Sequence, residues 1–180
     1  MQTYIGLLRG INVGGKRIIA MPQLKLAFEE AGFADVRTYI NSGNVLFSAE
    51  ETDTLALQHT CRQLIADRFD LDIPTAVISA DALANALANA PSWWGDDPDA
   101  KHNAIFVIAP TTAASVIADI GEAKPVYERV AHCGSVIFWS APIATFSHTR
   151  WSKVSSTAAY AHITIRNANT AKKLLTLARQ

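Results

Sequence analysis

The stretch VRTYINSGNVLF, residues 36–47, decides the fold of this chain. Apolar, aromatic and β-branched residues stand on both sides of NSGN at 41–44, which has the composition of a tight turn. Two strand-like runs joined by such a turn predict a β-hairpin, with strands over 36–40 and 45–47. We therefore expect a sheet built around this hairpin.

The segments on both sides of the hairpin alternate between strand and helix. The apolar run 4–8 predicts a buried strand, and a helix is expected over 22–32 because Pro favours the first helical turn and Gly the position past the end. After the hairpin, the pattern predicts a helix over 53–69, a strand over 75–78 and a further helix capped by Ser79. The order βαββαβ is typical of the ferredoxin-like fold, a four-stranded antiparallel sheet with two helices on one face.

The same order recurs in the second half of the chain. The run Gly43–Phe47 is similar to Gly134–Phe138, and Val77–Asp81 is similar to Ile165–Asn169. These similarities predict a duplication. The expected strands lie over 104–108, 126–131, 136–139 and 163–165, and the expected helices over 111–120, within 147–160 and from about Asn169.

Residues 91–101, PSWWGDDPDAK, are the predicted boundary between the halves. They contain two prolines, a glycine and three aspartates, a composition that interrupts both strands and helices. The sequence therefore predicts an α+β chain with two ferredoxin-like βαββαβ halves. The first half covers 1–90, the linker 91–101 and the second half 102–180.

Composition is that of a globular protein. Hydrophobic residues make up 49% and charged residues 18%, so disorder is not expected. No apolar run reaches the roughly 18 residues that a membrane-spanning helix needs, and Arg9 interrupts the apolar stretch that a signal peptide would require. Cys61 and Cys133 have no CxxC partner, which is typical of a reducing compartment. We expect a cytoplasmic protein without a membrane partner.

Charge is segregated along the chain although the net charge is zero. Residues 1–28 carry +4, residues 29–128 carry −11 and residues 129–180 carry +7, and the two basic segments contain no acid. Such segregation indicates an anionic partner. Alternatively, basic and acidic stretches face each other within the fold, and the sequence leaves both interpretations open.

The run GINVGGK at 10–16 matches the G-x-x-x-x-G-K spacing of a phosphate-binding loop. Arg17 stands where that loop needs a magnesium-binding Ser or Thr, and the next helix is expected only from Pro22. A nucleoside triphosphatase is therefore disfavoured. The loop either binds an anion through its amides and cations, or it is a tight turn whose glycines supply positive φ.

The predicted topology brings this loop next to the hairpin turn. A right-handed crossover makes the first two strands parallel, so both end at the same edge of the sheet. We expect the candidate ligand-binding residues of the first half to share this rim. They are Arg9, Asn12, Gly14, Gly15, Lys16, Asn41, Ser42 and Asn44.

Two polar runs of the second half are further candidates. His148–Lys153 interleaves cations with Trp151, which could stack on bases, although a helix start with one buried Trp is the simpler interpretation. Arg166, Asn167 and Asn169 stand where a strand meets a helix and complete the candidate ligand-binding set. Asn167 or Asn169 also suits a helix N-cap.

Catalytic and metal motifs are weak. The five histidines show no i,i+4 pair and no acidic companion at ligand spacing, and there is no G-x-S-x-G. Asp96, Asp97 and Asp99 could bind a hard cation, but a solvated linker is the simpler interpretation. The sequence predicts no metal site and no cofactor, and it identifies no catalytic residue.

Three motifs resemble an uncharacterised, largely bacterial family known as domain of unknown function 1697. They are YIGLLRGINVGGK at 4–16, TYINSGNVLFS at 38–48 and TIRNANT at 164–170. The resemblance implies a duplicated α+β architecture and brings no accepted activity, substrate or catalytic residue. Ala168 stands where the family usually has Trp, so a ligand contacted by that aromatic would be bound differently here.

Three functions remain. The first is non-catalytic binding of a phosphorylated small molecule or of nucleic acid. The second is an enzyme acting on a small anionic substrate, with Lys16 or Arg9 stabilising developing negative charge. The third is a protein–protein interaction module, including a homo-oligomer held by basic and acidic surfaces.

Overall fold

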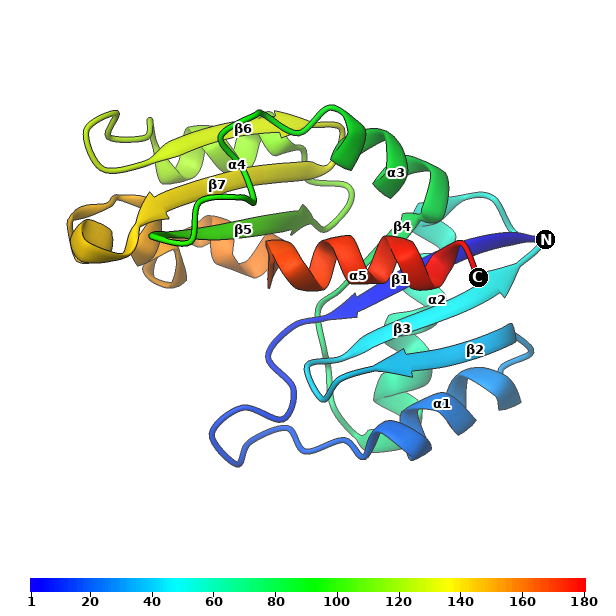
Figure 1. Cartoon of the computed structure of the whole chain (residues 1–180). Coiled ribbons are helices and arrows are strands. Elements are labelled where there is room, and N and C mark those ends of the chain that lie inside the picture. The colour runs from blue at the N-terminus through cyan, green and yellow to red at the C-terminus, as the bar shows by residue number, and fades with distance from the viewer. The chain divides into compact units, whose positions relative to one another are not determined.

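Two four-stranded antiparallel sheets form the framework of the computed structural model, which describes residues 1–180 (Figure 1). The chain divides into two compact units. The first consists of Met1–Ala82 together with Leu174–Gln180, and the second of Leu83–Lys173. No helix is both long and apolar enough to cross a membrane.

The first unit has the ferredoxin-like strand order β2-β3-β1-β4. Helix α1 begins with Pro22 in its first turn, and α2 begins at the N-cap Asp53, whose Oδ1 accepts a hydrogen bond from the Leu55 amide at 2.9 Å. The elements are β1 (Gln2–Leu8), α1 (Met21–Glu30), β2 (Ala34–Tyr39), β3 (Asn44–Ala49), α2 (Thr54–Phe69), β4 (Thr75–Ser79) and the start of α3 (Ala80–Ala88).

One core lies between this sheet and its two helices. Tyr4 and Phe47 from the strands stack at 5.9 Å between ring centroids, and Phe47 also meets Phe28 of α1 at 5.5 Å. Cys61 of α2 is fully buried in this core, and burial raises the pKa of its thiol to about 12. The thiol therefore stays protonated at physiological pH.

The second unit repeats the arrangement with the order β6-β7-β5-β8. Its core gathers Ile105, Ile137, Trp139 and Trp151 on one face of the sheet. The α+β class and the duplication of the four-stranded ferredoxin-like arrangement are thus confirmed. The elements are β5 (Ala100–Val107), α4 (Ala113–Ile120), β6 (Arg129–Cys133), β7 (Val136–Pro142), β8 (Ile163–Asn167) and α5 (Ala168–Ala178).

The prediction of an α-helix within residues 147–160 is wrong. Three short 3₁₀-helices replace it: η1 (Ile143–His148), η2 (Trp151–Ser156) and η3 (Ala158–His162). Side-chain hydroxyls bond the carbonyls three residues earlier: Thr149 to Phe146 and Thr157 to Val154, both at 2.7 Å. Because such bonds compete with the α-helical pattern, this Ser- and Thr-rich segment turns tightly and repeatedly instead.

The internal alignment needs one correction. The Leu8 amide donates to the Gly43 carbonyl, and the Val107 amide donates to the Ser135 carbonyl, at 2.8 and 2.9 Å. Gly43 therefore corresponds to Ser135 rather than to Gly134, and the core residue Phe47 corresponds to Trp139. A slip of one residue moves a strand side chain to the opposite face, so the sequence similarity was misleading by one position.

The second alignment is confirmed. Val77 pairs with Gly6 and Ile165 pairs with Ile105, which makes the two strands equivalent in register. Ser79 then matches Asn167, and both cap the helix that follows. Ser79 Oγ accepts from the Ala82 amide at 3.1 Å, and Asn167 Oδ1 accepts from the Thr170 amide at 2.8 Å.

Candidate functional site

The loop after β1 and the β2–β3 turn lie side by side in the first unit, as the topology predicts. Besides the bond from Leu8 to Gly43, the Asn12 Nδ2 donates to the Asn41 carbonyl at 2.9 Å. The expected rim therefore exists as a structural feature. Its individual residues have different surroundings.

Residues 12–17 form a small two-stranded hairpin, called the finger below. Val13 and Lys16 make an isolated β-bridge, and the Lys16 amide donates to the Val13 carbonyl at 3.1 Å. Gly14 and Gly15 at the tip have φ of 59° and 72°. Positive φ at both central residues defines a type I′ turn, which explains the Gly-Gly pair without a phosphate-binding loop.

Asn12 ties the base of the finger in place. Its Nδ2 donates to the carbonyls of Ile19 and Asn41, both at 2.9 Å, and its Oδ1 accepts from the Ile19 amide at 2.8 Å. Both amide hydrogens and the carbonyl oxygen are thus engaged within the protein. Asn12 positions the finger and has little capacity left for a ligand.

The candidates in the β2–β3 turn have mainly structural surroundings as well. Asn44 is fully buried, and its Nδ2 donates to the Tyr39 carbonyl and to Ser42 Oγ, both at 3.0 Å. Gly43 has φ of 82°, and a Cβ there would lie 2.7 Å from the Cβ of Leu8. These residues build a turn that only glycine permits at position 43.

Cations and aliphatic side chains remain accessible on the finger and beside it. Lys16 and Arg17 are exposed, and Arg9 is half-buried. Val13 and Ile18 are 65% and 71% exposed. Arg17 is not in the candidate set predicted from the sequence, although it is one of the cations of the loop.

One carboxylate lies near the finger, but it is already paired. Asp72 accepts hydrogen bonds from Nε and Nη2 of Arg62. The bond from Arg62 is the main cause that lowers the pKa of Asp72, and the charge of Arg17 contributes less. Asp72 therefore offsets little of the finger's positive charge.

In the second unit, the three late-motif candidates separate into different environments. Arg166 is 7% exposed, its Nη1 donates to Thr164 Oγ1 and the Ile165 carbonyl at 2.9 Å, and burial lowers its pKa to about 10. Asn167 is the N-cap of α5, and Asn169 is exposed in its first turn. The buried Arg166 is therefore an internal residue of its sheet.

The interpretation of His148–Lys153 as a base-stacking segment is wrong. Trp151 has no exposed surface, and its Nε1 donates to the Gly121 carbonyl at 3.2 Å. The simpler interpretation, a helix start with one buried Trp, is correct for the burial of Trp151. The helix that contains it is a 3₁₀-helix and not an α-helix.

Sequence reasoning missed a polar pair around His102. Register places His102 of β5 opposite Ser140 of β7, and His102 Nδ1 lies 2.6 Å from Ser140 Oγ. Only the register of β5 and β7 indicates that these two residues face each other. The misaligned repeat gave β7 the wrong register and so did not reveal the pair. No group of three or more His, Cys, Asp or Glu is arranged to hold a metal ion.

Comparison with known proteins gives a family and a fold. The chain matches the model of a family described as "Protein of unknown function (DUF1697)" over residues 1–138. No curated protein matches it. A solved structure of the conserved bacterial protein SP0830 from Streptococcus pneumoniae is similar, with 28% identity, 98% of each chain covered and a TM-score of 0.88. Since the family match covers well over half of the sequence, this chain belongs to the family described as protein of unknown function (DUF1697).

Proposed function

We propose that the chain binds the phosphate groups of single-stranded nucleic acid through the finger of its first unit. The observation that carries the proposal is the exposure of Lys16 and Arg17 on a projecting hairpin that contains no acid. Phosphate contacts by Lys and Arg supply most of the affinity in non-specific nucleic-acid binding.

The shape of the finger favours an extended polyanion over a free nucleotide. A Cβ added to Gly14 or Gly15 would meet nothing within 4 Å, so the turn projects away from its surroundings. Small-molecule sites are usually concave and enclose most of their ligand. A projecting cationic hairpin instead suits the spaced phosphates of a strand.

The finger is also preorganised. Asn12 bonds Ile19 on one side and Asn41 on the other, so little chain order has to be gained on binding. Val13 and Ile18 are exposed beside the cations and can contact unstacked bases, which a single strand offers and a duplex hides.

The test is a titration of a short fluorescent RNA at about 50 and 200 mM salt. Two neutralised phosphates give a slope of roughly −1.4 in log K against log salt, which weakens binding roughly sevenfold over this range. Lys16→Ala should reduce the slope to roughly −0.7. Lys25→Ala removes the same charge from an exposed position on α1 and is the matched control.

Absence of binding, or equal weakening by Lys16→Ala and Lys25→Ala, would refute the proposal. Competition by a free nucleotide at concentrations similar to those of the RNA would instead indicate a small-ligand site. An acidic peptide that displaces the RNA with the same salt slope would indicate a protein partner.

A further inference from the structure

A cavity of about 280 Å³ lies in the second unit, at the end of the sheet where β5 starts and β7 ends. Three strand residues, His102, Arg129 and Ser140, bring polar groups to it, and so does Glu128, which directly precedes β6. Glu128 is buried and already accepts bonds from Trp139 Nε1 and from the three backbone amides of residues 124, 150 and 151. The other three belong to one row across the sheet, because Ser140 pairs with His102 on one side and with Arg129 on the other.

The hydrogen bonds of His102 determine its tautomer. Its Nε2 lies 2.9 Å from the Asp97 carbonyl, which can only accept, so Nε2 carries the hydrogen. In the neutral ring, Nδ1 is then the acceptor, and Ser140 Oγ at 2.6 Å is its donor. A serine hydroxyl that donates to an oriented imidazole has the arrangement of a nucleophile and its general base.

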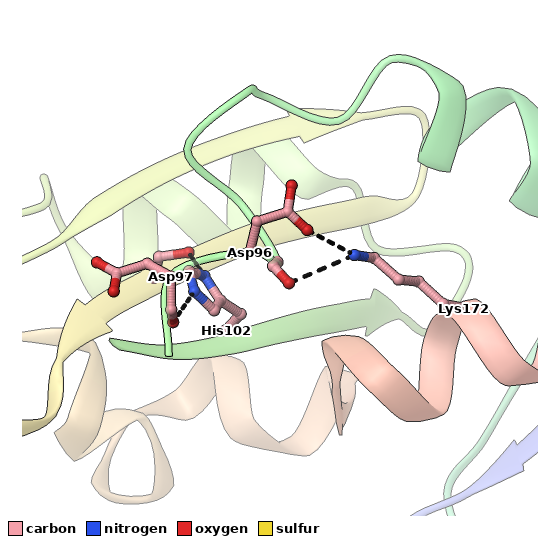
Figure 2. Close-up of polar contacts among 6 residues, drawn as sticks. Asp96, Asp97, His102 and Lys172 are labelled. Carbon is pink, nitrogen blue, oxygen red and sulfur yellow. Dashed lines mark hydrogen bonds and ion pairs between the residues drawn. The ribbon is translucent and has the colours of Figure 1, made fainter. Parts of the chain in front are cut away.

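The segment that leads into Asp97 is held by Lys172, as Figure 2 shows. Lys172 from α5 reaches the Asp96 carboxylate at 3.2 Å and the Gly95 carbonyl at 3.4 Å. Trp94 Nε1 donates to the Asn103 carbonyl at 2.8 Å, and its ring meets Phe138 edge-on at 4.9 Å. Residues 94–96, which directly precede Asp97, are thus attached to α5 and to the sheet, which limits the motion of the carbonyl that orients the imidazole.

Arg129 supplies the positive charge beside this pair. It is exposed and lies directly opposite Ser140 in the register of β6 and β7. Opposed strand residues have Cβ atoms roughly 5 Å apart, so the guanidinium can reach a group bonded to Ser140 Oγ. A cation at that point stabilises the negative oxygen that develops when an acyl group is attacked.

We propose that Ser140, His102 and Arg129 form an acyl-transfer site that hydrolyses small carboxylic esters. Ser140 is the nucleophile, His102 the general base and acid, and Arg129 the group that stabilises the oxyanion. Trp93, Val126 and Pro142 line the same cavity and suit a short apolar or aromatic substituent on the ester.

The steps are those of a two-stage ester hydrolysis. Ser140 Oγ bonds to the ester carbonyl carbon while its proton passes to His102 Nδ1. The bond to the leaving oxygen breaks, that oxygen takes the proton from Nδ1, and the alcohol departs. Water then attacks the acyl carbon and gives its proton to Nδ1. Collapse returns that proton to Ser140 Oγ and releases the carboxylic acid.

The first experiment labels the intact wild-type protein with a fluorophosphonate probe and maps the adduct by peptide mass spectrometry. Attack by Ser140 forms an Oγ–P bond and releases fluoride. The expected result is a single adduct, at Ser140. Turnover is measured in parallel with p-nitrophenyl acetate as the substrate. No adduct, or an adduct only at other residues, overturns the proposal without any variant being needed.

Variants then assign the roles. His102→Ala should slow labelling by about 10²–10⁴-fold, the usual contribution of a general base. Ser140→Ala should abolish both labelling and turnover. Arg129→Gln should lower kcat for the ester by about 10²-fold, as loss of an oxyanion donor does.

Ser48→Ala is the matched control. Ser48 occupies the corresponding strand position of the first unit but faces Thr3 instead of a histidine, so its loss should leave labelling unchanged. Thermal unfolding of each variant separates lost chemistry from lost fold. If His102→Ala remains folded and labels at the wild-type rate, His102 is not a base and the inference is wrong.

Discussion

The two units share a strand order. At one matched pair of facing strand positions, however, they carry different side chains. Thr3 faces Ser48 in the first sheet, and His102 faces Ser140 in the second. The backbone bonds from Leu8 to Gly43 and from Val107 to Ser135 fix this equivalence. Both units therefore have a serine at this position, whereas the facing residue carries a hydroxyl in the first unit and an imidazole in the second. The frame sets where chemistry can occur, and single side chains decide whether it does.

The connections differ more than the strands. The first unit has a long loop after β1 that carries the finger, whereas only the short stretch 108–112 separates β5 from α4. The finger lies at the end of β1, and the His102 pair lies near the start of β5. The two copies thus carry their candidate sites at opposite ends of the same frame, one on a loop and the other on paired strands.

The largest expected difference concerns what covers each core. The first unit uses the α-helix α2, and the second uses 3₁₀ turns around the fully buried Trp151. Trp151→Ala should lower the free energy of unfolding by about 3–5 kcal/mol, because it empties a large buried volume. Urea unfolding monitored by circular dichroism measures this. Trp93→Ala, at a partly exposed position of the same unit, is the control and should cost clearly less.

Substitution of a hairpin glycine should lower the free energy of unfolding by different amounts in the two units, and this difference is smaller than that expected for Trp151. Gly43→Ala should cost about 2–3 kcal/mol, because its Cβ would meet Leu8 at 2.7 Å in a backbone with φ of 82°. Gly134→Ala should cost only about 1 kcal/mol, since its Cβ would meet nothing within 4 Å and only the left-handed backbone is penalised. Thermal unfolding of both variants provides the comparison. Equal losses would show that the crowding at Gly43 relaxes freely.

The smallest effect concerns pH. Arg62 lowers the pKa of Asp72 in the folded protein. The pair therefore stabilises the first unit at pH values above the pKa that Asp72 has in the unfolded chain. This stabilisation is lost as the pH falls through the lower pKa of the folded state. Both side chains are exposed, so Arg62→Ala should cost only about 0.2–1 kcal/mol at neutral pH. Chemical denaturation at pH 7 and at strongly acidic pH should show this difference shrinking. If Arg62→Ala lowers the free energy of unfolding by the same amount at both pH values, the loss comes from packing of the arginine side chain and not from the ion pair.

Much of the fold could be predicted from local sequence. The Asn-Ser-Gly-Asn turn, Pro22 and Ser79 each act through neighbouring backbone groups, so their signals are local and the elements around them were placed correctly. The segment 147–160 was not, because its apolar spacing suits an α-helix while its hydroxyls bond the backbone in a competing pattern. The repeat was misaligned by one residue, since Gly134 resembles Gly43 in type but not in register.

The candidate site could be predicted only where topology was sufficient. The rim follows from strand order alone, so the contact between Asn12 and Asn41 was foreseeable. The burial of Asn44 and Arg166 depends on which face of a sheet each side chain occupies and what covers it. The pairing of His102 with Ser140 joins residues 38 positions apart, and it requires the register of two strands.

The first unit also has a consequence for biosynthesis. Arg37 Nη2 donates at 2.9 Å to the Leu177 carbonyl, a group 140 residues further along the chain, and Leu174–Gln180 belongs to this unit. A further 140 residues must therefore be synthesised after Arg37 before its guanidinium can meet the Leu177 carbonyl. A ribosome that stalled before Leu174 would leave the first unit without this segment, although all four strands of its sheet had long been synthesised.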